Sequence, residues 1–351
     1  MDCSSRSVAP VTWHARTGLA SVGAPLRALP LAILYVTERC NSRCVSCDYW
    51  RHGRRDMSLA AVERLLPGFA SLRTQVILVS GGEPLLNPQW AEIARLLRGN
   101  GLRLWLLTAG LALAKHATEV SELFESVTVS LDGTSRESYA ATRGVDAFAK
   151  VCEGIRVAVK GGARVGLRVT VQRANCGELP RFVSLARELG AASISFLAAD
   201  VANEQAFGRM MGEGVSSEVA LRTEDLPCLS AAIDTLEREH AGDFRSGFIL
   251  ESVPKLRRLH QYYRGLCGLG DFPPVHCNAP EFSAVIGVDG GLSPCFFIPG
   301  PTGVENDDLA SGLNAPAMRR LRDDIRAQRR PECARCVCAK WRDPQLAGPW
   351  A

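Results

Sequence analysis

Three closely spaced cysteines are the residues of this chain whose type and spacing point most directly to metal chemistry. Cys40, Cys44 and Cys47 are separated by three and then by two residues. They follow an apolar run, Leu31 to Thr37, that predicts a buried strand. A four-iron cubane ordinarily takes four thiolates, so a three-cysteine loop leaves one iron free to bind another molecule. Zinc is the alternative, although a closed zinc site needs a fourth ligand.

A second group of cysteines lies near the C-terminus, where six of the thirteen fall within residues 267–338. Two pairs of thiolates make a complete four-ligand site, and by spacing alone it fits zinc as readily as iron–sulfur. The pairs are, across a predicted hairpin, Cys277 with Cys295 and, in a CxxC motif, Cys333 with Cys336. The roles of Cys267 and Cys338 stay open. Each either replaces one of the four or helps to hold a second cluster.

The composition favours a cytoplasmic protein. Thirteen cysteines in a reducing cytoplasm are more often metal ligands than disulfides. A net charge of +4 with scattered arginines leaves no footprint for nucleic acid, and no apolar run is long enough to span a membrane. The N-terminus does not read as a secretory signal. We expect the four isolated cysteines to be small buried hydrophobes: Cys3, Cys152, Cys176 and Cys228.

The elements that must position these residues alternate from residue 31 to about 200, in the pattern of βα units around a parallel sheet. The predicted strands are Leu31–Thr37, Gln75–Ser80, Leu102–Thr108, Ser126–Leu131, Arg164–Val171 and Ser193–Leu197. They lack strict alternation, which predicts burial on both faces. Ser58 is predicted to cap one helix and Asn87 the next, and Gly190 is predicted to end a third.

The length of 351 residues predicts one large domain with a smaller appendage. The expected divisions are an N-terminal extension over 1–30, an α/β core over 31–200, a helical connector over 201–275 and a C-terminal domain over 276–351. In the last, Asp289-Gly290-Gly291 predicts a tight turn between two strands. The strands are predicted at Phe282–Val288 and Leu292–Phe297, and a helix at Ala315–Arg329.

Short motifs follow the other predicted strands. In order they are Ser80-Gly81-Gly82-Glu83-Pro84, Thr108-Ala109-Gly110, and Ser130-Leu131-Asp132-Gly133 followed by Arg143-Gly144. Paired glycines let a backbone approach a ligand closely, and a carboxylate accepts from an ammonium group. Together with the cysteine loop, and each in its expected structural context, these motifs resemble the radical S-adenosylmethionine (SAM) superfamily.

The resemblance implies a partial (βα)6 barrel, similar to a TIM barrel, with a catalytic [4Fe–4S] cluster on Cys40, Cys44 and Cys47. SAM would chelate the open iron and be cleaved by an electron from the cluster to a 5′-deoxyadenosyl radical, which abstracts a hydrogen atom from the substrate. The residue before the third cysteine is often aromatic in the family and stacks on adenine. Here it is Ser46, so Tyr49 or Trp50 would take over.

The resemblance also assigns residues to SAM itself. Its amino group would meet the motif Gly81, Gly82, Glu83 and Pro84. Its ribose and methionine carboxylate would be reached by Ser130 and Arg143.

Next to such a core, the C-terminal cysteines resemble a twitch or SPASM extension. This implies a small α+β extension with one auxiliary [4Fe–4S] cluster on Cys277, Cys295, Cys333 and Cys336. The series is compressed relative to a full SPASM pattern, which favours one auxiliary cluster and leaves a second open. Four thiolates suit transfer of the electron left on a substrate radical, which completes a two-electron oxidation.

We expect the substrate to be a small molecule, such as a sugar or another natural-product or cofactor intermediate. A maturase of ribosomal peptides is the alternative, served by a separate leader-binding partner, since only about thirty residues precede the first strand. The reductant would be a protein such as flavodoxin or ferredoxin. A non-catalytic iron–sulfur or zinc scaffold or redox protein is the alternative of another class, although it does not explain the Gly-Gly-Glu-Pro motif.

Overall fold

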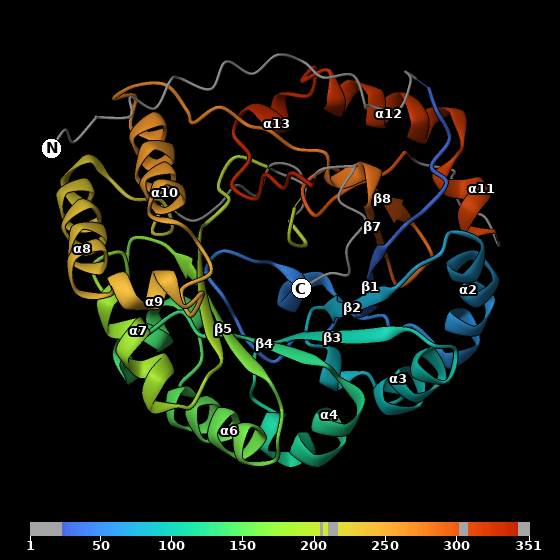
Figure 1. Ribbon diagram of the computed structural model, residues 1–351, viewed down its shortest axis with the longest axis horizontal. Coiled ribbons are helices and arrows are strands. Elements are labelled where there is room, and N and C mark those ends of the chain that lie inside the picture. The colour runs from blue at the N-terminus through green and yellow to red at the C-terminus, as the bar shows by residue number, and fades with distance from the viewer. Residues whose placement is uncertain (1–22, 204–205, 210–216, 302–307, 343–351) are drawn as a thin grey trace, which may run out of the picture.

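The computed structural model describes residues 23–203, 206–209, 217–301 and 308–342. Its strands form one eight-stranded sheet in the order β6-β5-β4-β3-β2-β1-β7-β8, curved into a partial barrel with helices around the outside (Figure 1). The strands are β1 Leu31–Thr37, β2 Val76–Gly81, β3 Arg103–Thr108, β4 Ser126–Ser130, β5 Val165–Val171, β6 Ser193–Ala198, β7 Ser283–Ile286 and β8 Leu292–Ser293. All six strands predicted for the core are confirmed, and each pairs in parallel with the next.

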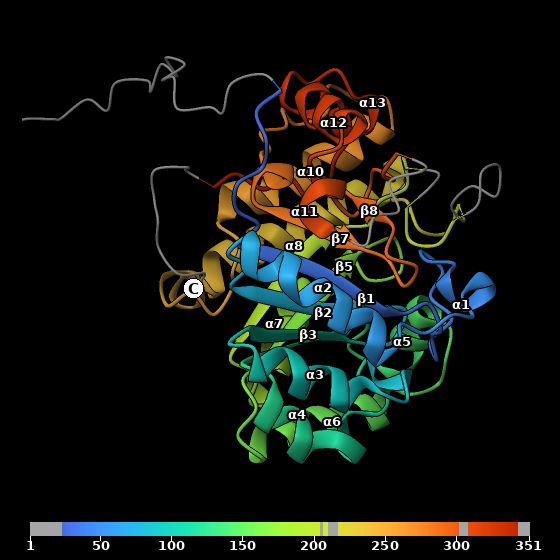
Figure 2. The ribbon, with the colours of Figure 1, turned by 90° about the vertical axis from the view of Figure 1, so that its right-hand side faces the viewer.

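Helices connect and cover these strands. The α-helices are α1 Tyr49–His52, α2 Leu59–Ser71, α3 Trp90–Gly99, α4 Ala117–Leu123, α5 Arg136–Arg143, α6 Phe148–Lys160, α7 Leu179–Glu188, α8 Leu226–Glu239, α9 Ala241–Arg245, α10 Val253–Leu266, α11 Leu309–Leu313, α12 Pro316–Arg326 and α13 Pro331–Ala334. Short 3₁₀ turns are η1 Pro84–Leu86, η2 Leu113–His116, η3 Thr223–Asp225 and η4 Ala279–Glu281. Figure 2 shows α1 and α5 at the same end of the sheet.

The two faces of the sheet are not buried equally. β3 alternates between half-buried and fully buried residues, and β5 does the same. Leu104 and Leu106 of β3 join the hydrophobic core, whereas Trp105 between them is only half-buried. The prediction of full burial on both faces is therefore wrong for these strands. The reason is that an open barrel leaves its inner face partly accessible.

Two of the helix-end predictions are confirmed. Ser58 caps α2, accepting a hydrogen bond from the Ala61 N–H at 3.2 Å. Gly190 follows α7 with φ +74, a left-handed conformation that glycine adopts at little cost, and so ends the helix.

The C-terminal hairpin is present but short. β7 and β8 pair antiparallel around the turn, where Gly290 has φ +81. β7 also pairs in parallel with β1, from Leu31 opposite Ser283 onward. The segment after residue 276 therefore contributes strands to the same sheet as the core. The domain boundaries proposed from the sequence stay a prediction.

The isolated cysteines do not all behave alike. Cys152 and Cys176 are buried, as predicted, but Cys228 near the start of α8 is exposed, so the prediction of burial is wrong there. The Cys228 thiol lies beside Gly177 and hydrogen-bonds with the Cys176 thiol, so the residue stands at the edge of this contact with part of its surface in solvent. Cys3 lies outside the described residues. Among the described helices, none combines the length and apolar character that crossing a membrane requires.

Candidate functional site

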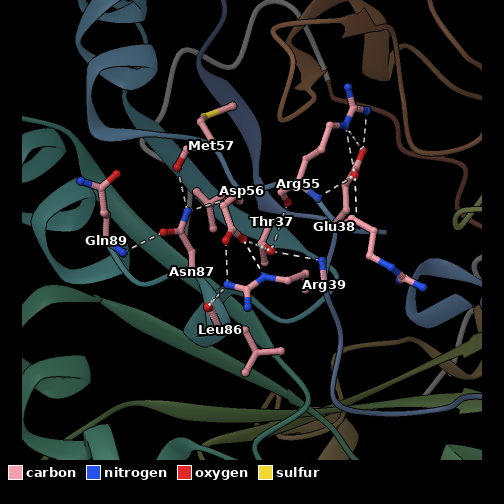
Figure 3. A network of polar contacts seen from close by, with 11 residues as sticks. Thr37, Glu38, Arg39, Arg55, Asp56, Met57, Leu86, Asn87 and Gln89 are labelled. Atoms are coloured by element: carbon pink, nitrogen blue, oxygen red, sulfur yellow. Dashed lines mark hydrogen bonds and ion pairs between the residues drawn. The ribbon is translucent and has the colours of Figure 1, made fainter. Parts of the chain in front are cut away.

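The cysteine loop leaves β1 through a polar network (Figure 3). Thr37, the last residue of β1, donates from Oγ1 to Asp56 at 2.5 Å, and the Arg39 N–H donates to Thr37 Oγ1 at 3.1 Å. The Arg39 guanidinium reaches Asp56 at 2.7 Å and the Leu86 carbonyl at 2.5 Å. These bonds fix the backbone immediately before Cys40.

Asn87 strengthens the same network rather than capping a helix. Its Nδ2 donates to the carbonyls of Val36 at 2.7 Å and Met57 at 2.8 Å, while its Oδ1 accepts from the Gln89 N–H at 2.8 Å (Figure 3). α3 begins only at Trp90, so the prediction that Asn87 caps this helix is wrong. Its amide oxygen instead accepts from the N–H of Gln89 in the turn that precedes α3, while its amide nitrogen bonds to two buried carbonyls, at the end of β1 and before α2.

The end of α5 holds the middle of the cysteine loop. The Arg43 N–H donates to the Arg143 carbonyl at 2.9 Å, and the Val45 N–H donates to the Thr142 carbonyl at 3.2 Å. Gly144 ends α5 with φ +67, and a Cβ at this position would lie 2.1 Å from the Arg43 carbonyl oxygen. Only glycine therefore fits between the two segments.

The three thiols of the loop share one environment. Burial, with Cys44 nearby, raises the pKa of the Cys40 thiol to about 11 and that of the Cys47 thiol to about 12. Burial also raises the pKa of Cys44, and the Arg143 guanidinium opposes that shift. Because thiolates are the form that binds metal, a buried cation beside Cys44 favours ligation.

The arrangement of acidic and metal-binding side chains bears on what the loop could hold. Within the described residues, no group of three or more His, Cys, Asp or Glu side chains is placed to hold a metal ion. The thiolates of a cubane bind different irons and need not converge on one point. Three thiols on one loop thus fit an iron–sulfur cluster with one open corner.

The Gly-Gly-Glu-Pro motif packs against the start of the cysteine loop. The Gly82 N–H donates to the Thr37 carbonyl and the Glu83 N–H to the Arg39 carbonyl, both at 2.8 Å. Gly81 has φ +127, and a Cβ on Gly82 would lie 2.3 Å from the Arg39 carbonyl oxygen. The close approach that these glycines permit is therefore an approach to the chain itself.

The Glu83 carboxylate is completely buried and surrounded by donors of the protein. It accepts from Thr108 Oγ1 at 2.8 Å, from the Ala109 N–H at 2.6 Å and from the Leu85 N–H at 3.2 Å. Burial raises the pKa of the Glu83 carboxyl, and these hydrogen bonds oppose the shift. Glu83 thus ties the end of β2 to the end of β3, with Pro84 starting η1 beside it. A direct contact with an ammonium group stays a prediction.

Asp132 and Arg143 form a buried ion pair beside the loop, a pairing that sequence reasoning missed. Arg143 Nη1 lies 3.0 Å from Asp132 Oδ2, and their side chains are 11% and 4% exposed. Asp132 also accepts from the Thr170 N–H at 2.7 Å. Although burial opposes its charge, Cys44 and Asp132 raise the pKa of Arg143. Ser130, at the end of β4, is half-buried.

The four predicted C-terminal ligands lie close enough to influence one another. Burial raises the pKa of the Cys295 thiol to about 12, with Cys277 and Cys333 adding to the shift. Burial also raises the pKa of Cys336, and Cys338, Cys277 and Cys295 contribute. These mutual influences place the four cysteines and Cys338 in one region of the fold, and their role as ligands of one cluster stays a prediction.

Cys267, left open by the sequence, follows α10 directly. Its Sγ donates to the Leu221 carbonyl at 3.5 Å. This bond ties the end of α10 to the segment that precedes η3.

Aromatic residues link the two cysteine regions. The ring of Tyr49 meets that of Tyr35 edge-on at 5.9 Å, and Tyr35 lies 6.4 Å from the ring of Phe296, next to Cys295. Trp50 packs against the Arg51 guanidinium at 4.4 Å. Stacking of either ring on adenine stays a prediction.

Sequence reasoning also missed a segment after β6 that touches the cysteine loop. The Phe207 carbonyl accepts from the Asp48 N–H at 2.9 Å, and Arg209 Nη2 donates to the Ser46 carbonyl at 3.0 Å. No motif marks this segment, because contacts to backbone carbonyls impose little on residue spacing. These contacts could therefore be found only from the structure.

Comparison with known proteins supports this description. Residues 34–185 match the family model described as the Radical SAM superfamily. An Fe-coproporphyrin III synthase of Methanosarcina barkeri is 31% identical over 56% of this chain and 50% of its own length. A probable GTP 3′,8-cyclase of Saccharolobus islandicus is 31% identical over 50% of this chain and 58% of its own. The chain thus spans about half the length of these curated relatives.

Solved structures share the fold over most of the chain. Streptococcus suis SuiB bound to S-adenosylmethionine superimposes with a TM-score of 0.60 at 14% identity, covering 85% of this chain and 68% of SuiB. The structure of SuiB bound to the precursor peptide SuiA gives a TM-score of 0.64 at 14% identity, covering 87% of this chain and 68% of SuiB.

Proposed function

We propose that this chain, whose residues 34–185 match the Radical SAM superfamily, is a radical SAM enzyme that cleaves SAM reductively and oxidatively modifies a small molecule. The observation that carries the proposal is the half-buried loop of Cys40, Cys44 and Cys47, clamped between the Gly-Gly-Glu-Pro turn and the end of α5. Those three thiols would hold a [4Fe–4S] cluster and leave one iron open. When bound, the cluster supplies the electron that converts SAM to methionine and a hydrogen-abstracting 5′-deoxyadenosyl radical.

The residues around the loop would hold and orient SAM. Gly81 and Gly82 keep the backbone of the turn close to the loop, and the buried Glu83 with Pro84 fixes its conformation. Ser130 would face the ribose. Arg143 is held by Asp132, yet its Nε is buried without a hydrogen-bond partner among the described residues. An unpaired buried donor is suited to a carboxylate such as that of methionine.

The C-terminal cysteines would hold one auxiliary [4Fe–4S] cluster, as the electrostatic coupling of Cys295 with Cys277 and Cys333 supports. Four protein thiolates leave no iron open and suit electron transfer. When bound there, the cluster would supply an acceptor for the electron that remains after hydrogen abstraction. Cys338 is the alternative ligand to Cys336, because its thiol is close enough to contribute to the raised pKa of Cys336.

A small-molecule substrate is supported by relatives named as a porphyrin synthase and a GTP cyclase. A peptide substrate is the second candidate, because the fold resembles that of SuiB, which was solved with a precursor peptide. Both candidates need an external one-electron donor, and a reduced flavodoxin or ferredoxin has suitable chemistry. Only the peptide candidate calls for a separate leader-binding partner.

The experiment that tests the proposal compares two variants with the parent after anaerobic reconstitution. One has alanine at Cys40, Cys44 and Cys47. The other has alanine at Cys277, Cys295, Cys333 and Cys336. We expect about eight irons in the parent and about four in each variant, because each [4Fe–4S] unit holds four irons.

The formation of 5′-deoxyadenosine separates enzyme from scaffold. The reduced parent and the C-terminal variant should form 5′-deoxyadenosine, and the loop variant should not. A parent that binds iron without cleaving SAM would instead support the non-catalytic scaffold. Zinc in place of iron at the C-terminal site would overturn the auxiliary cluster.

A further inference from the structure

The segment that follows β6 carries a buried ion pair that the proposed function has not used. Asp200 and Arg209 lie 3.1 Å apart, and their side chains are only 1% and 2% exposed. The Arg209 guanidinium also donates to the Asn203 carbonyl at 2.7 Å, to the Asp200 carbonyl at 2.6 Å and to the Ser46 carbonyl at 3.0 Å. Four acceptors around one guanidinium hold it in a single orientation.

This segment grips the Cys47 end of the cysteine loop at two further points. The Phe207 carbonyl accepts from the Asp48 N–H at 2.9 Å, a hydrogen bond that does not depend on the protonation of Cys47. In the free thiol form Cys47 Sγ also donates to this carbonyl at 3.3 Å, a bond that a thiolate ligand would lose. Gly208 has φ +76, and a Cβ there would lie 2.7 Å from the Tyr49 nitrogen, so the backbones are in contact. The Arg209 guanidinium also lies 5.4 Å from the centre of the Phe207 ring, so it packs against a side chain of this turn as well.

We propose that Asp200 and Arg209 are positioning residues that fix Cys47 for cluster binding, an inference that rests on the proposed function. The rest of the loop is already held elsewhere: the network at Thr37 holds the Cys40 end, and α5 holds Arg43 and Val45. Arg209 supplies the third anchor at Ser46. Burial of two charges costs free energy unless both are paired and bonded, as they are here. Such an arrangement favours fixed geometry rather than stability.

The ion pair also keeps the surroundings of Cys47 electrically balanced. Removal of Arg209 leaves the Asp200 carboxylate uncompensated near the loop, whereas removal of the Asp200 charge leaves the guanidinium uncompensated. A nearby cation favours the reduced, more negative cluster, and a nearby anion disfavours it. The two halves of the pair therefore shift the reduction potential of the cluster in opposite directions, which loosening of the loop alone would not do.

The test uses the full chain, anaerobically reconstituted, with Arg209→Met, Arg209→Lys and Asp200→Asn. Arg322→Met is the matched control, because Arg322 is another buried arginine, bonded to the Leu313 carbonyl in the C-terminal region. The readouts are the rate of iron release to a chelator and the midpoint potential of the catalytic cluster by EPR-monitored titration. Each variant is measured with the four C-terminal cluster cysteines replaced by alanine, so that only the catalytic cluster contributes.

We expect Arg209→Met to release iron roughly tenfold or more faster than the parent, the scale seen when a group that orients a metal ligand is removed. Arg209→Lys keeps the positive charge but lacks the planar set of guanidinium N–H donors. Its rate of iron release should therefore lie between those of the parent and Arg209→Met. The midpoint potential should fall in Arg209→Met, rise in Asp200→Asn and stay unchanged in Arg322→Met.

Iron release at the parental rate from both Arg209 variants would overturn the positioning role, as would equal acceleration in Arg322→Met. Potential shifts of the same sign in Arg209→Met and Asp200→Asn would overturn the electrostatic balance. If the parent itself bound no iron, the proposed function would fail first, and the two failures are thus distinct.

Discussion

Gly144 offers a sharp test of how α5 supports the cysteine loop. The residue has φ +67 and follows Arg143 directly, so it stands where the helix meets the loop. Replacement by alanine would add a Cβ 2.1 Å from the Arg43 carbonyl oxygen, far inside a normal contact. One of the two segments must therefore move, and the hydrogen bond from the Arg43 N–H to the Arg143 carbonyl moves with it.

The size of the effect follows from two contributions. Holding an L-residue in the left-handed region costs about 1–2 kcal/mol. Crowding a well-packed site adds about 1–3 kcal/mol. Gly144→Ala should therefore lower the free energy of unfolding by about 2–5 kcal/mol. Gly101 is the matched control: it has φ +80, and a Cβ added there would meet nothing within 4 Å, so Gly101→Ala carries only the first contribution.

Urea unfolding of these two variants, both with the cysteine loop intact, gives the difference directly, and iron content after reconstitution shows whether the loop has moved. We expect Gly101→Ala to bind as much iron as the parent and Gly144→Ala to bind less. Equal destabilisation by the two substitutions, or full iron content in Gly144→Ala, would refute the reasoning that α5 and the loop are in forced contact.

Three further predictions concern other parts of the chain. Asp132→Ala leaves the buried Arg143 charge unpaired and should lower the free energy of unfolding, measured with urea, by about 3–5 kcal/mol. A decrease below about 1 kcal/mol would show that the pair is solvated. Burial lowers the pKa of His260, so the unfolded chain binds its proton more readily and stability should fall as pH drops below about 6.5. His260→Asn should flatten that fall, and an unchanged pH profile would contradict it. Under native conditions iodoacetamide should alkylate the exposed Cys228 before the buried Cys152, as peptide mass spectrometry can check.

Much of the core can be predicted because its signals are local. Each apolar run between helical segments predicts a strand, and the six predicted strands of the core agree with the observed ones within a residue or so at each end. Ser58 is recognisable as a cap because only the next turn of chain decides that role. The three cysteines of the loop lie together by spacing alone, since only the short run from Cys40 to Cys47 separates them.

Features that depend on distant partners could not be predicted. Asn87 has the sequence signature of a cap, but its amide bonds to Val36 and Met57, which only the fold brings near. The pairing of β7 with β1 joins residues about 250 positions apart, and the sequence of neither strand indicates which other strand it pairs with. The ion pair of Asp200 and Arg209 could not be predicted from the sequence either, because an Asp and an Arg in a polar stretch usually face solvent.

The central claim is that the loop of Cys40, Cys44 and Cys47 holds a cluster with one iron open to SAM. Its most direct test is the EPR spectrum of the reduced protein that retains these three cysteines and has alanine in place of the four C-terminal ligands, recorded with and without SAM. We predict a clear change in the spectrum on addition of SAM, because SAM would bind the cluster itself. A reduced cluster whose spectrum is the same with and without SAM would contradict the account.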